Sequence, residues 1–576
     1  MKLNFNFHTL RVSLSLSFLC LIAANAADRP NVILIITDDQ GYGDIGVHGN
    51  PVLKTPNLDK LHDESLRFTD FHSHPFCTPT RSAIMTGRYP GRNGAFRTSS
   101  GRTLMHTDEI TMPEVFAANG YVTGLVGKWH LGDNAPHRPQ DRGFQEVLWH
   151  KAGGVGQGPD FWGNRYFDDT YERVKAGSKQ GTYEKFEGYC TDIWFTEAAD
   201  FVKRHQDKPF FLYLSTNAPH GPYFVGDEWK APYIDLKHKS VPEFFGMIAN
   251  LDYNLGLFRQ YLQELGLAEN TILIFMSDNG SAKGVPVYNA GMSGGKSRIT
   301  DGGHRIPFFF HWPKGDIAKP QDVPGLAAHL DIFPTLAELC GLNLPDAYEP
   351  DGVSLTPILK APEASSPRDL FVVQFHGGAM FDDPIEAWTN SAVLSERWRL
   401  LDGKKLFDIK QDSAQRKDLA TEYPEVVAQM RSQYMPWWES VSPRMKLVRI
   451  DIGNPDENPT HLNSQDWVME GTNPPWAQGA ISRRPQVTGP WMLHVRKAGT
   501  YRFTLRQRPQ EAPSPLNAVR AKIEIAGLSQ EADVPAGAEF VSFTLNLPAG
   551  ETELVTYLYD QNGRFGGAYY TEVEAL

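Results

Sequence analysis

The chain has 576 residues, of which 41% are hydrophobic, and its formal net charge at pH 7 is −12. This length favours more than one domain, with enough apolar residues for large cores. An acidic protein has no general electrostatic attraction for polyanions, which argues against nucleic acid as a partner. An anionic substrate would therefore need a local pocket of positive charge.

The N-terminal segment predicts export. Lys2 and Arg11 precede an apolar run over residues 12–24, which ends in Ala24-Asn25-Ala26, a small-x-small cleavage pattern. Residues 1–26 are therefore predicted to be a signal peptide. No second apolar segment of membrane-spanning length follows, so we expect no membrane insertion and a periplasmic or secreted mature protein.

Carboxylates follow two predicted strands of a parallel sheet. Residues 31–36 (NVILII) form a continuous apolar run, typical of a strand buried on both faces, and Asp38 and Asp39 come directly after it. Residues 271–276 (TILIFM) repeat this pattern before Asp278 and Asn279. Open α/β sheets bind ligands at such strand ends. Adjacent carboxylates repel unless a cation lies between them, and oxygen ligands suit Ca²⁺ or Mg²⁺ better than zinc.

A cysteine with a proline and a cation beside it lies between these two strands. Cys77 begins the pentapeptide CTPTR, which includes Pro79 and Arg81 and precedes a segment with a helical pattern. A half-buried thiol in a turn would explain this stretch if nothing else in the chain matched it.

Further polar residues follow two other predicted strands. Residues 121–126 lead into Gly127-Lys128-Trp129-His130, and in extended backbone the side chains of Lys128 and His130 point to the same side. Residues 209–215 are followed by His220, which stands in Pro219-His220-Gly221-Pro222, where the prolines restrict the backbone.

Read together, these segments resemble the type I sulfatases, the formylglycine-dependent family of the alkaline-phosphatase-like superfamily. The matching elements occur in the order DD, CxPxR, GKWH, PH, DN and GGK over residues 30 to about 350, and the GGK element ends at Lys296. The resemblance implies an α/β fold, in which a large mixed, mainly parallel sheet is flanked by helices and followed by a small antiparallel-sheet C-terminal subdomain. It also implies that a maturation enzyme oxidises Cys77 to Cα-formylglycine, whose hydrate attacks the sulfur of a sulfate ester.

The resemblance also implies the role of each site residue. Asp278 accepts the proton of the attacking hydroxyl, His220 protonates the leaving oxygen, and His130 is the base of the later elimination. Three cationic residues bind the sulfate or hold the formylglycine, namely Arg81, Lys128 and Lys296. The implied Ca²⁺ ligands are Asp38, Asp39, residue 77, Asp278 and Asn279.

Three residues outside these motifs are candidate substrate contacts. His150 and Arg165 lie at the two ends of a loop region rich in glycine and aromatic residues, which suits contact with sugar rings and further sulfates. An ordinary aromatic surface loop is an equally good reading. His376, in Gln374-Phe375-His376, could reach the mouth of the pocket.

The C-terminal part changes character. Residues 391–401 and 405–409 look like strands separated by an Asp402-Gly403 hairpin signal, and a helical pattern covers residues 423–435. Beyond residue 445, apolar alternation and regular turn signals predict a β-sandwich-like accessory module, which either binds carbohydrate or packs against the enzyme, and we favour the second. Trp467, Trp476, Tyr569 and Tyr570 would serve either role. The predicted divisions are 27–365 (catalytic domain), 366–444 (C-terminal subdomain) and 445–576 (accessory module).

The remaining cysteines leave a disulfide open. Cys190 and Cys340 could pair in an oxidising compartment, or they could be two separate buried thiols.

The sequence thus predicts a sulfuric ester hydrolase that acts on a sulfated carbohydrate or polysaccharide. Two alternatives remain: a phosphodiesterase or phosphonate monoester hydrolase of the same superfamily, and a carbohydrate-binding protein with a vestigial site.

Overall fold

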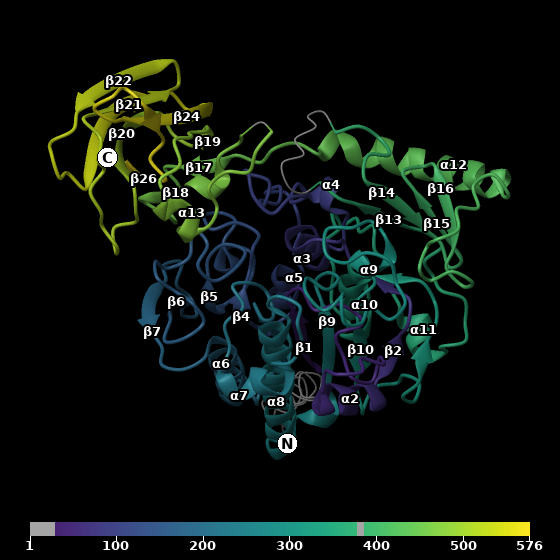
Figure 1. Cartoon of the computed structure of the whole chain (residues 1–576). Helices are drawn as coiled ribbons and strands as arrows, with labels where there is room; N and C mark the ends of the chain where they lie inside the picture. Colours follow the sequence, from purple (N-terminus) through teal and green to yellow (C-terminus); the bar gives the residue numbers. More distant parts are fainter. Residues whose placement is uncertain (1–28, 377–384, 470) are drawn as a thin grey trace, which may run out of the picture.

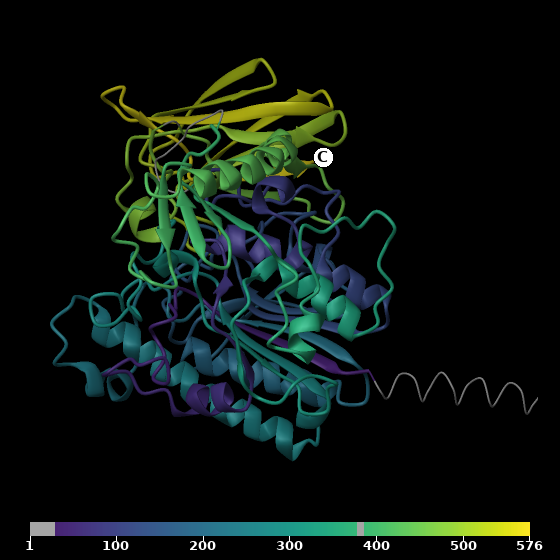
Figure 2. The ribbon, with the colours of Figure 1, turned by 90° about the vertical axis from the view of Figure 1, so that its right-hand side faces the viewer.

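The computed structural model describes residues 29–376, 385–469 and 471–576, so the predicted signal peptide lies outside the described residues. One large sheet with helices on both faces forms the body of the molecule (Figure 1). A four-stranded sheet with a long helix, in green, and the C-terminal strands, in yellow, lie beyond one edge of this body (Figures 1 and 2). In the described part of the chain, no helix has the length and apolar character needed to cross a membrane.

The large sheet confirms the predicted α/β class. Its central strands, β9, β1, β8, β4 and β5, are all parallel, and antiparallel β10 and β6 border them on either side. In sheet order the strands are β11 (Asp322–Val323), β2 (Leu66–Phe68), β10 (Phe308–His311), β9 (Thr271–Ser277), β1 (Asn31–Thr37), β8 (Phe210–Ser215), β4 (Val122–Lys128), β5 (Glu146–His150), β6 (Thr170–Val174) and β7 (Thr182–Lys185).

Helices cover both faces of this sheet, which explains why its central strands are apolar throughout. Every residue of β1, β8 and β9 is buried. One face packs against α2 (Pro56–Asp63), α6 (Cys190–Arg204) and α8 (Val241–Glu264). The other packs against α3 (Cys77–Thr86), α5 (Met112–Ala118) and α10 (Ile332–Leu339).

The large sheet also separates the two cysteines for which the sequence left a disulfide open. Cys190 belongs to the core on one face of the sheet and Cys340 to the core on the other face, and both are free, buried thiols. They cannot form a disulfide with each other in this fold.

The four-stranded sheet is antiparallel, with the order β13 (Phe371–Gln374), β14 (Ser391–Leu394), β15 (Trp398–Leu401) and β16 (Lys405–Asp408). The single strand expected over residues 391–401 is wrong, because a turn separates β14 from β15, where the Ser395 N–H donates to the Trp398 carbonyl. The hairpin at Asp402-Gly403 is confirmed, and both residues have positive φ, as a tight hairpin turn requires. The predicted helix is longer than expected, since α12 spans Pro424–Val441.

The C-terminal strands form two sheets, and their inward side chains share one apolar core. The first sheet contains β17 (Ile450–Ile452), β19 (Trp491–Val495), β24 (Gly550–Tyr559), β21 (Arg520–Ile525) and β22 (Leu528–Asp533), with β25 (Phe565–Gly566) paired to β24. The second contains β18 (Thr460–Asn463), β26 (Tyr570–Ala575), β20 (Gly499–Arg506) and β23 (Phe540–Leu547). All these pairs are antiparallel except β17 with β19.

Shorter elements complete the description. They are β3 (Phe71–His72), β12 (Ala327–Ala328), α4 (Pro90–Asn93), α7 (Asp227–Lys230), α9 (Asp301–His304), α11 (Thr356–Lys360) and α13 (Gln478–Ser482).

A buried charge network joins the large-sheet body to the four-stranded sheet. Arg399 of β15 is fully buried and donates hydrogen bonds to Asp70 Oδ1 at 2.8 Å and to Asp301 Oδ1 at 3.1 Å. His72 lies within 2.9 Å of the same Asp70 oxygen. Burial opposes ionisation of Asp70, but Arg399 and His72 outweigh burial and hold the pKa of this carboxyl well below its usual range.

We expect the Arg399→Met substitution to lower the free energy of unfolding by about 3 to 5 kcal/mol, because it leaves two buried carboxylates without their cation. Urea denaturation followed by tryptophan fluorescence measures this. Lys410→Met is the matched control: its pair with Glu396 is largely exposed, with side chains 46% and 69% accessible, and an exposed pair contributes about 0 to 1 kcal/mol. Equal urea midpoints for the two variants would contradict the role of the network.

Candidate functional site

The strand register brings the polar strand ends to one edge of the sheet. In the parallel pairs, Thr37 of β1 aligns with Ser277 of β9, and Ile36 aligns with Ser215 of β8. Asp38 and Asp278 therefore leave the sheet side by side, and the Asp38 N–H bonds to the Ala218 carbonyl in the segment after β8. This is the carboxyl edge, where open α/β sheets bind ligands.

Cys77 is the first residue of α3, and its side chain points into this group. Its Sγ lies 3.4 Å from Asp38 Oδ1, 3.6 Å from Asn279 Oδ1 and 3.7 Å from Lys296 Nζ. Burial and the neighbouring Asp278 and Asp38 raise the pKa of the thiol well above its usual value. An unmodified Cys77 would therefore be a protonated thiol, and a poor nucleophile.

Each of the three carboxylates has a cationic partner. Lys128 Nζ lies 2.6 Å from Asp38 Oδ2, Arg81 Nη2 lies 2.8 Å from Asp278 Oδ2, and Lys296 Nζ lies 2.5 Å from Asp39 Oδ1. The side chains of Arg81 and Lys128 are completely buried, whereas that of Lys296 is 17% exposed. Arg81 and Lys128 thus position carboxylates, and Lys296 also faces the space above Cys77.

The environments of the carboxylates differ, and so do their pKa values. Burial opposes ionisation of Asp39, but Lys296, His220 and Asn279 outweigh it and lower the pKa of this group to about 2. Burial and the nearby Asp38 raise the pKa of Asp278 to about 6, in spite of Arg81. The two pKa values therefore differ because Asp39 has stronger compensation from cationic and hydrogen-bonding neighbours, whereas burial and Asp38 dominate at Asp278.

His130 and His220 flank Cys77. His130 has φ 59°, a left-handed backbone that is rare for residues other than glycine. Its Nε2 lies 3.2 Å from the Thr98 carbonyl, and its Nδ1 is buried without a partner among the described residues. Gly153 lies against the ring, because a Cβ at this position would be 2.2 Å from His130 Cε1.

His220 Nδ1 lies 2.6 Å from the Gly221 carbonyl, so Nδ1 carries a proton and the neutral ring presents Nε2 as an acceptor. Nε2 is 4.0 Å from Asp39 Oδ2. Burial and the charge of Lys296 lower the pKa of His220 to about 3. Burial and Lys128 lower that of His130 well below its usual value.

These groups open into a cavity of about 270 Å³. Four of the predicted site residues line it, namely Cys77, His130, His220 and Lys296. The other lining residues are Phe76, Thr98, Ser99, Gln157, Gln465, Asn473 and Trp476. Sequence reasoning missed the roles of Gln157, Gln465 and Asn473, since no motif or periodicity distinguishes these polar loop residues.

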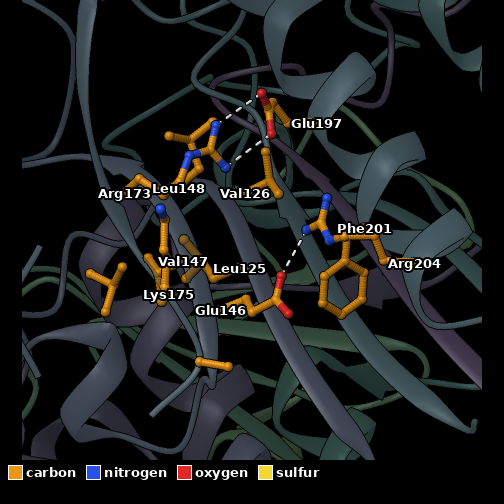
Figure 3. Close-up of a pocket in the computed structure, with 12 residues that line it drawn as sticks. Leu125, Val126, Glu146, Val147, Leu148, Arg173, Lys175, Glu197, Phe201 and Arg204 are labelled. Carbon is orange, nitrogen blue, oxygen red and sulfur yellow. Dashed lines mark hydrogen bonds and ion pairs between the residues drawn. The ribbon is translucent and has the colours of Figure 1, made fainter. Parts of the chain in front are cut away.

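A second cavity, of about 340 Å³, lies between α6 and strands β4 to β6 (Figure 3). Four of its charged side chains form ion pairs: Arg173 pairs with Glu197 at 3.0 Å, and Arg204 pairs with Glu146 at 2.7 Å. None of the predicted site residues lines it. The cavity lined by Cys77, His130, His220 and Lys296 is the candidate active site, because it contains four of the predicted site residues.

The three candidate substrate contacts lie outside the set that lines this cavity. His150 is 1% exposed at the end of β5, and its Nδ1 lies 2.9 Å from the Lys151 carbonyl. Arg165 is exposed on the surface. His376 lines a separate small cavity with Phe96 and Trp437. Their predicted contact with substrate remains a prediction.

The donor set at Cys77 fits a hard divalent cation. Single ligand atoms of Asp38, Asp39, Cys77 and Asp278 all lie within 4.8 Å of one another, and all four residues are buried. Asp38 Oδ1 and Asn279 Oδ1 both approach position 77. A cation here would relieve the repulsion that raises the pKa of Asp278, and oxygen donors are the ligands Ca²⁺ prefers. Asp70, His72 and Asp301 form another group of possible metal ligands. There the Arg399 guanidinium already supplies the positive charge that a metal ion would bring.

Comparison with known proteins places the chain in a family. Residues 30–342 match the family model described as Sulfatase. The human N-acetylgalactosamine-6-sulfatase is 33% identical over 58% of this chain and 67% of the relative, and human arylsulfatase A is 35% identical over 61% and 72%. The crystal structure of Ps i-CgsB superposes with a TM-score of 0.63 at 30% identity, covering 73% of this chain and 94% of that chain.

The family model spans β1 to α10, and so it includes every strand end that contributes to the cavity. The relatives include arylsulfatase A and steryl-sulfatase, which are sulfatases and cleave sulfuric esters. This protein is accordingly a sulfuric ester hydrolase, and the chain belongs to the sulfatase family.

Proposed function

We propose that this enzyme removes sulfate from a sulfated carbohydrate, with formylglycine made from Cys77 as nucleophile and Ca²⁺ bound beside it. One observation supports this most: Cys77 lines the cavity, and its Sγ lies within 3.7 Å of Asp38 Oδ1, Asn279 Oδ1 and Lys296 Nζ. The carbohydrate class is supported by two relatives, the N-acetylgalactosamine-6-sulfatase and the crystal structure of Ps i-CgsB in complex with k-i-k-neocarrahexaose.

The residues fit the implied modification and metal. When present, formylglycine supplies a hydroxyl nucleophile through its hydrate, and Ca²⁺ neutralises charge on the sulfuryl oxygens. Asp38, Asp39, Asp278 and Asn279 would hold the ion together with residue 77. Arg81 and Lys128 hold Asp278 and Asp38 in place, since both cations are buried behind them.

Lys296 is the cation of this chain that meets the sulfate. Its ammonium lies between Asp39 and Cys77 and faces the cavity, so an anionic sulfuryl group can approach it without displacing a buried ion pair. Fixed positive charge aimed at developing negative charge contributes about 3 to 4 kcal/mol per well-placed donor.

Three residues move protons. Asp278, whose pKa is raised to about 6, accepts the proton of the attacking hydroxyl, and His130 is the base of the step that releases sulfate. His220 lines the cavity and protonates the leaving oxygen from Nε2, because Nδ1 is bonded to the Gly221 carbonyl. His220 is neutral in the free enzyme, and the charge of a bound sulfate, which offsets that of Lys296, would raise its pKa.

The proposal also covers the maturation partner of the protein and the compartment in which it works. A formylglycine-generating enzyme recognises the CTPTR segment before folding is complete, because Cys77 is 2% exposed in the folded chain. The apolar N-terminal segment supports export to the periplasm or the medium. We also retain the divisions 27–365, 366–444 and 445–576 as the proposed domains.

The first test is the mass of the peptide that contains residue 77. We expect a loss of about 18 Da relative to cysteine in active protein, because conversion to formylglycine replaces the thiol with an aldehyde. Cys77→Ala should abolish sulfate release from 4-nitrophenyl sulfate, whereas Cys340→Ala, which alters a buried thiol of the core, should keep it. Full activity with an intact thiol at residue 77 would refute the proposed nucleophile.

Removal of calcium provides the second test. We expect the chelated protein to melt at a lower temperature and to regain stability with Ca²⁺, by about 2.7 kcal/mol at one hundred times the dissociation constant. Asp39→Asn should weaken calcium binding in titration calorimetry. Asp316→Asn should not, since the Asp316 side chain is 96% exposed and pairs with Lys360 on the surface. A chelated protein that binds no calcium would contradict the metal site.

The third test separates leaving groups. A general acid contributes about 10² to 10⁴ in rate, and the contribution is largest for a poor leaving group. His220→Ala should therefore slow sulfate release from N-acetylgalactosamine 6-sulfate far more than from 4-nitrophenyl sulfate, whose leaving group needs no proton. The control is His238→Ala, an exposed histidine in the same part of the chain. An equal loss on both esters would show that His220 is not the general acid.

A comparison of wild-type activity on 4-nitrophenyl sulfate and on a phenyl phosphonate ester distinguishes a sulfatase from a phosphonate monoester hydrolase.

A further inference from the structure

Part of the wall of the active-site cavity comes from residues outside the part of the chain that matches the Sulfatase family model. Gln465, Asn473 and Trp476 line the cavity together with Cys77 and His220. All three belong to the predicted accessory module, far beyond residues 30–342, which match the family model. The chemistry of sulfate transfer therefore belongs to the core, whereas this wall is an addition to it.

The segment that carries these residues is attached to the catalytic loops by backbone hydrogen bonds. The Ser100 N–H donates to the Gln465 carbonyl at 2.9 Å, and the Gly158 N–H donates to the Trp476 carbonyl at 2.8 Å. Gln478 adds a side-chain bond from Nε2 to the Gln157 carbonyl at 3.0 Å. The loops on the other side of these bonds also line the cavity, through Thr98, Ser99 and Gln157. The wall is thus fixed relative to Cys77.

Gln465 presents an acceptor with no partner. The residue is 2% exposed, and its Oε1 is buried without a hydrogen bond among the described residues. Buried carbonyl oxygens are nearly always satisfied, so an unpaired one that borders a ligand cavity points to a donor on the ligand. Hydroxyl and amide N–H groups of a sugar are such donors. Sulfate is not, because its oxygens only accept.

Trp476 presents a flat apolar surface at the rim. It is 43% exposed and is the most exposed tryptophan in the described part of the chain, whereas Trp467 and Trp491 of the same module are buried in its core. An exposed aromatic ring beside a polar cavity suits a partner with one apolar face and polar edges. The C–H face of a sugar ring has this character.

We propose that the accessory module completes the substrate site, so that Gln465 accepts a hydrogen bond from the sugar unit in the cavity and Trp476 stacks on a sugar ring at the rim. The inference rests on the proposed function, and it assigns the module to recognition of the carbohydrate part of the substrate. The sulfate itself is held by Lys296 and the groups around Cys77.

Steady-state kinetics on two kinds of ester test this. We would compare the calcium-loaded wild type with Trp476→Ala, Trp476→Phe and Gln465→Met, using 4-nitrophenyl sulfate and a panel of sulfated oligosaccharides that includes neocarrahexaose. Phe565→Ala is the matched control, since Phe565 belongs to the same module, is also 43% exposed and does not line the cavity.

We expect Trp476→Ala and Gln465→Met to lower kcat/KM for the oligosaccharides about tenfold or more, mainly through KM, and to lower kcat/KM for 4-nitrophenyl sulfate much less, because that ester carries no sugar. Trp476→Phe should restore most of the loss, because it keeps an aromatic face. Phe565→Ala should match the wild type on both esters.

Two results would overturn the inference and leave the proposed function in place. Unchanged oligosaccharide kinetics in both variants would show that the wall makes no substrate contact, and an equal loss on both kinds of ester would show that the residues only support the fold.

Failure of the proposed function would look different: wild-type protein would release sulfate from no oligosaccharide. This result would overturn both the proposed function and the inference that rests on it.

Discussion

The burial of three carboxylates beside one cysteine is the constraint on which the active site depends. Asp38, Asp39 and Asp278 are at most 2% exposed, and charges removed from water are costly unless cations accompany them. The fold supplies one cation to each carboxylate: Arg81 of α3 pairs with Asp278, Lys128 at the end of β4 pairs with Asp38, and Lys296 in the loop after β9 pairs with Asp39. The remaining oxygens converge on position 77, where an additional cation is favoured. The proposed metal site and the position of Cys77 thus follow from the same arrangement of charges.

The same principle connects the parts of the molecule. Arg399 enters the large-sheet body from the four-stranded sheet and compensates Asp70 and Asp301, which would otherwise be buried acids without a cation. This link fixes the four-stranded sheet against β3 and α9, close in sequence to Cys77 and Lys296. The geometry of the site therefore depends on contacts made by residues that never approach the substrate.

The proposed accessory module adds a different kind of contact. Gln465, Asn473 and Trp476 bring polar and aromatic groups to the cavity instead of charge, and the backbone carbonyls of Gln465 and Trp476 accept hydrogen bonds from Ser100 and Gly158. Cys77 lies within the residues that match the family model, whereas Gln465, Asn473 and Trp476 lie beyond them, so these two parts of the cavity lining can vary independently. This division gives a physical route by which one sulfate-ester chemistry can serve different carbohydrates.

The sequence by itself determined the class of fold, the strands that carry the site and the reaction family. Buried parallel strands are continuous apolar runs, so β1 and β9 could be predicted with Asp38 and Asp278 at their ends, and adjacent parallel strands must bring these ends together. The hairpin at Asp402-Gly403 was likewise predictable, because its conformation is local.

Only the tertiary structure decided which residues share the cavity. Arg81 and Arg165 are both cations near predicted strands or loops, yet one lies buried behind Asp278 and the other on the surface. The turn that divides residues 391–401 and the approach of Gln465 and Trp476 to Cys77 had no periodic signal. The turn is local, but Ser395 to Trp398 contain no glycine, proline or asparagine to mark it. The approach of Gln465 and Trp476 depends on how irregular loops far apart in the sequence pack, which no local pattern encodes.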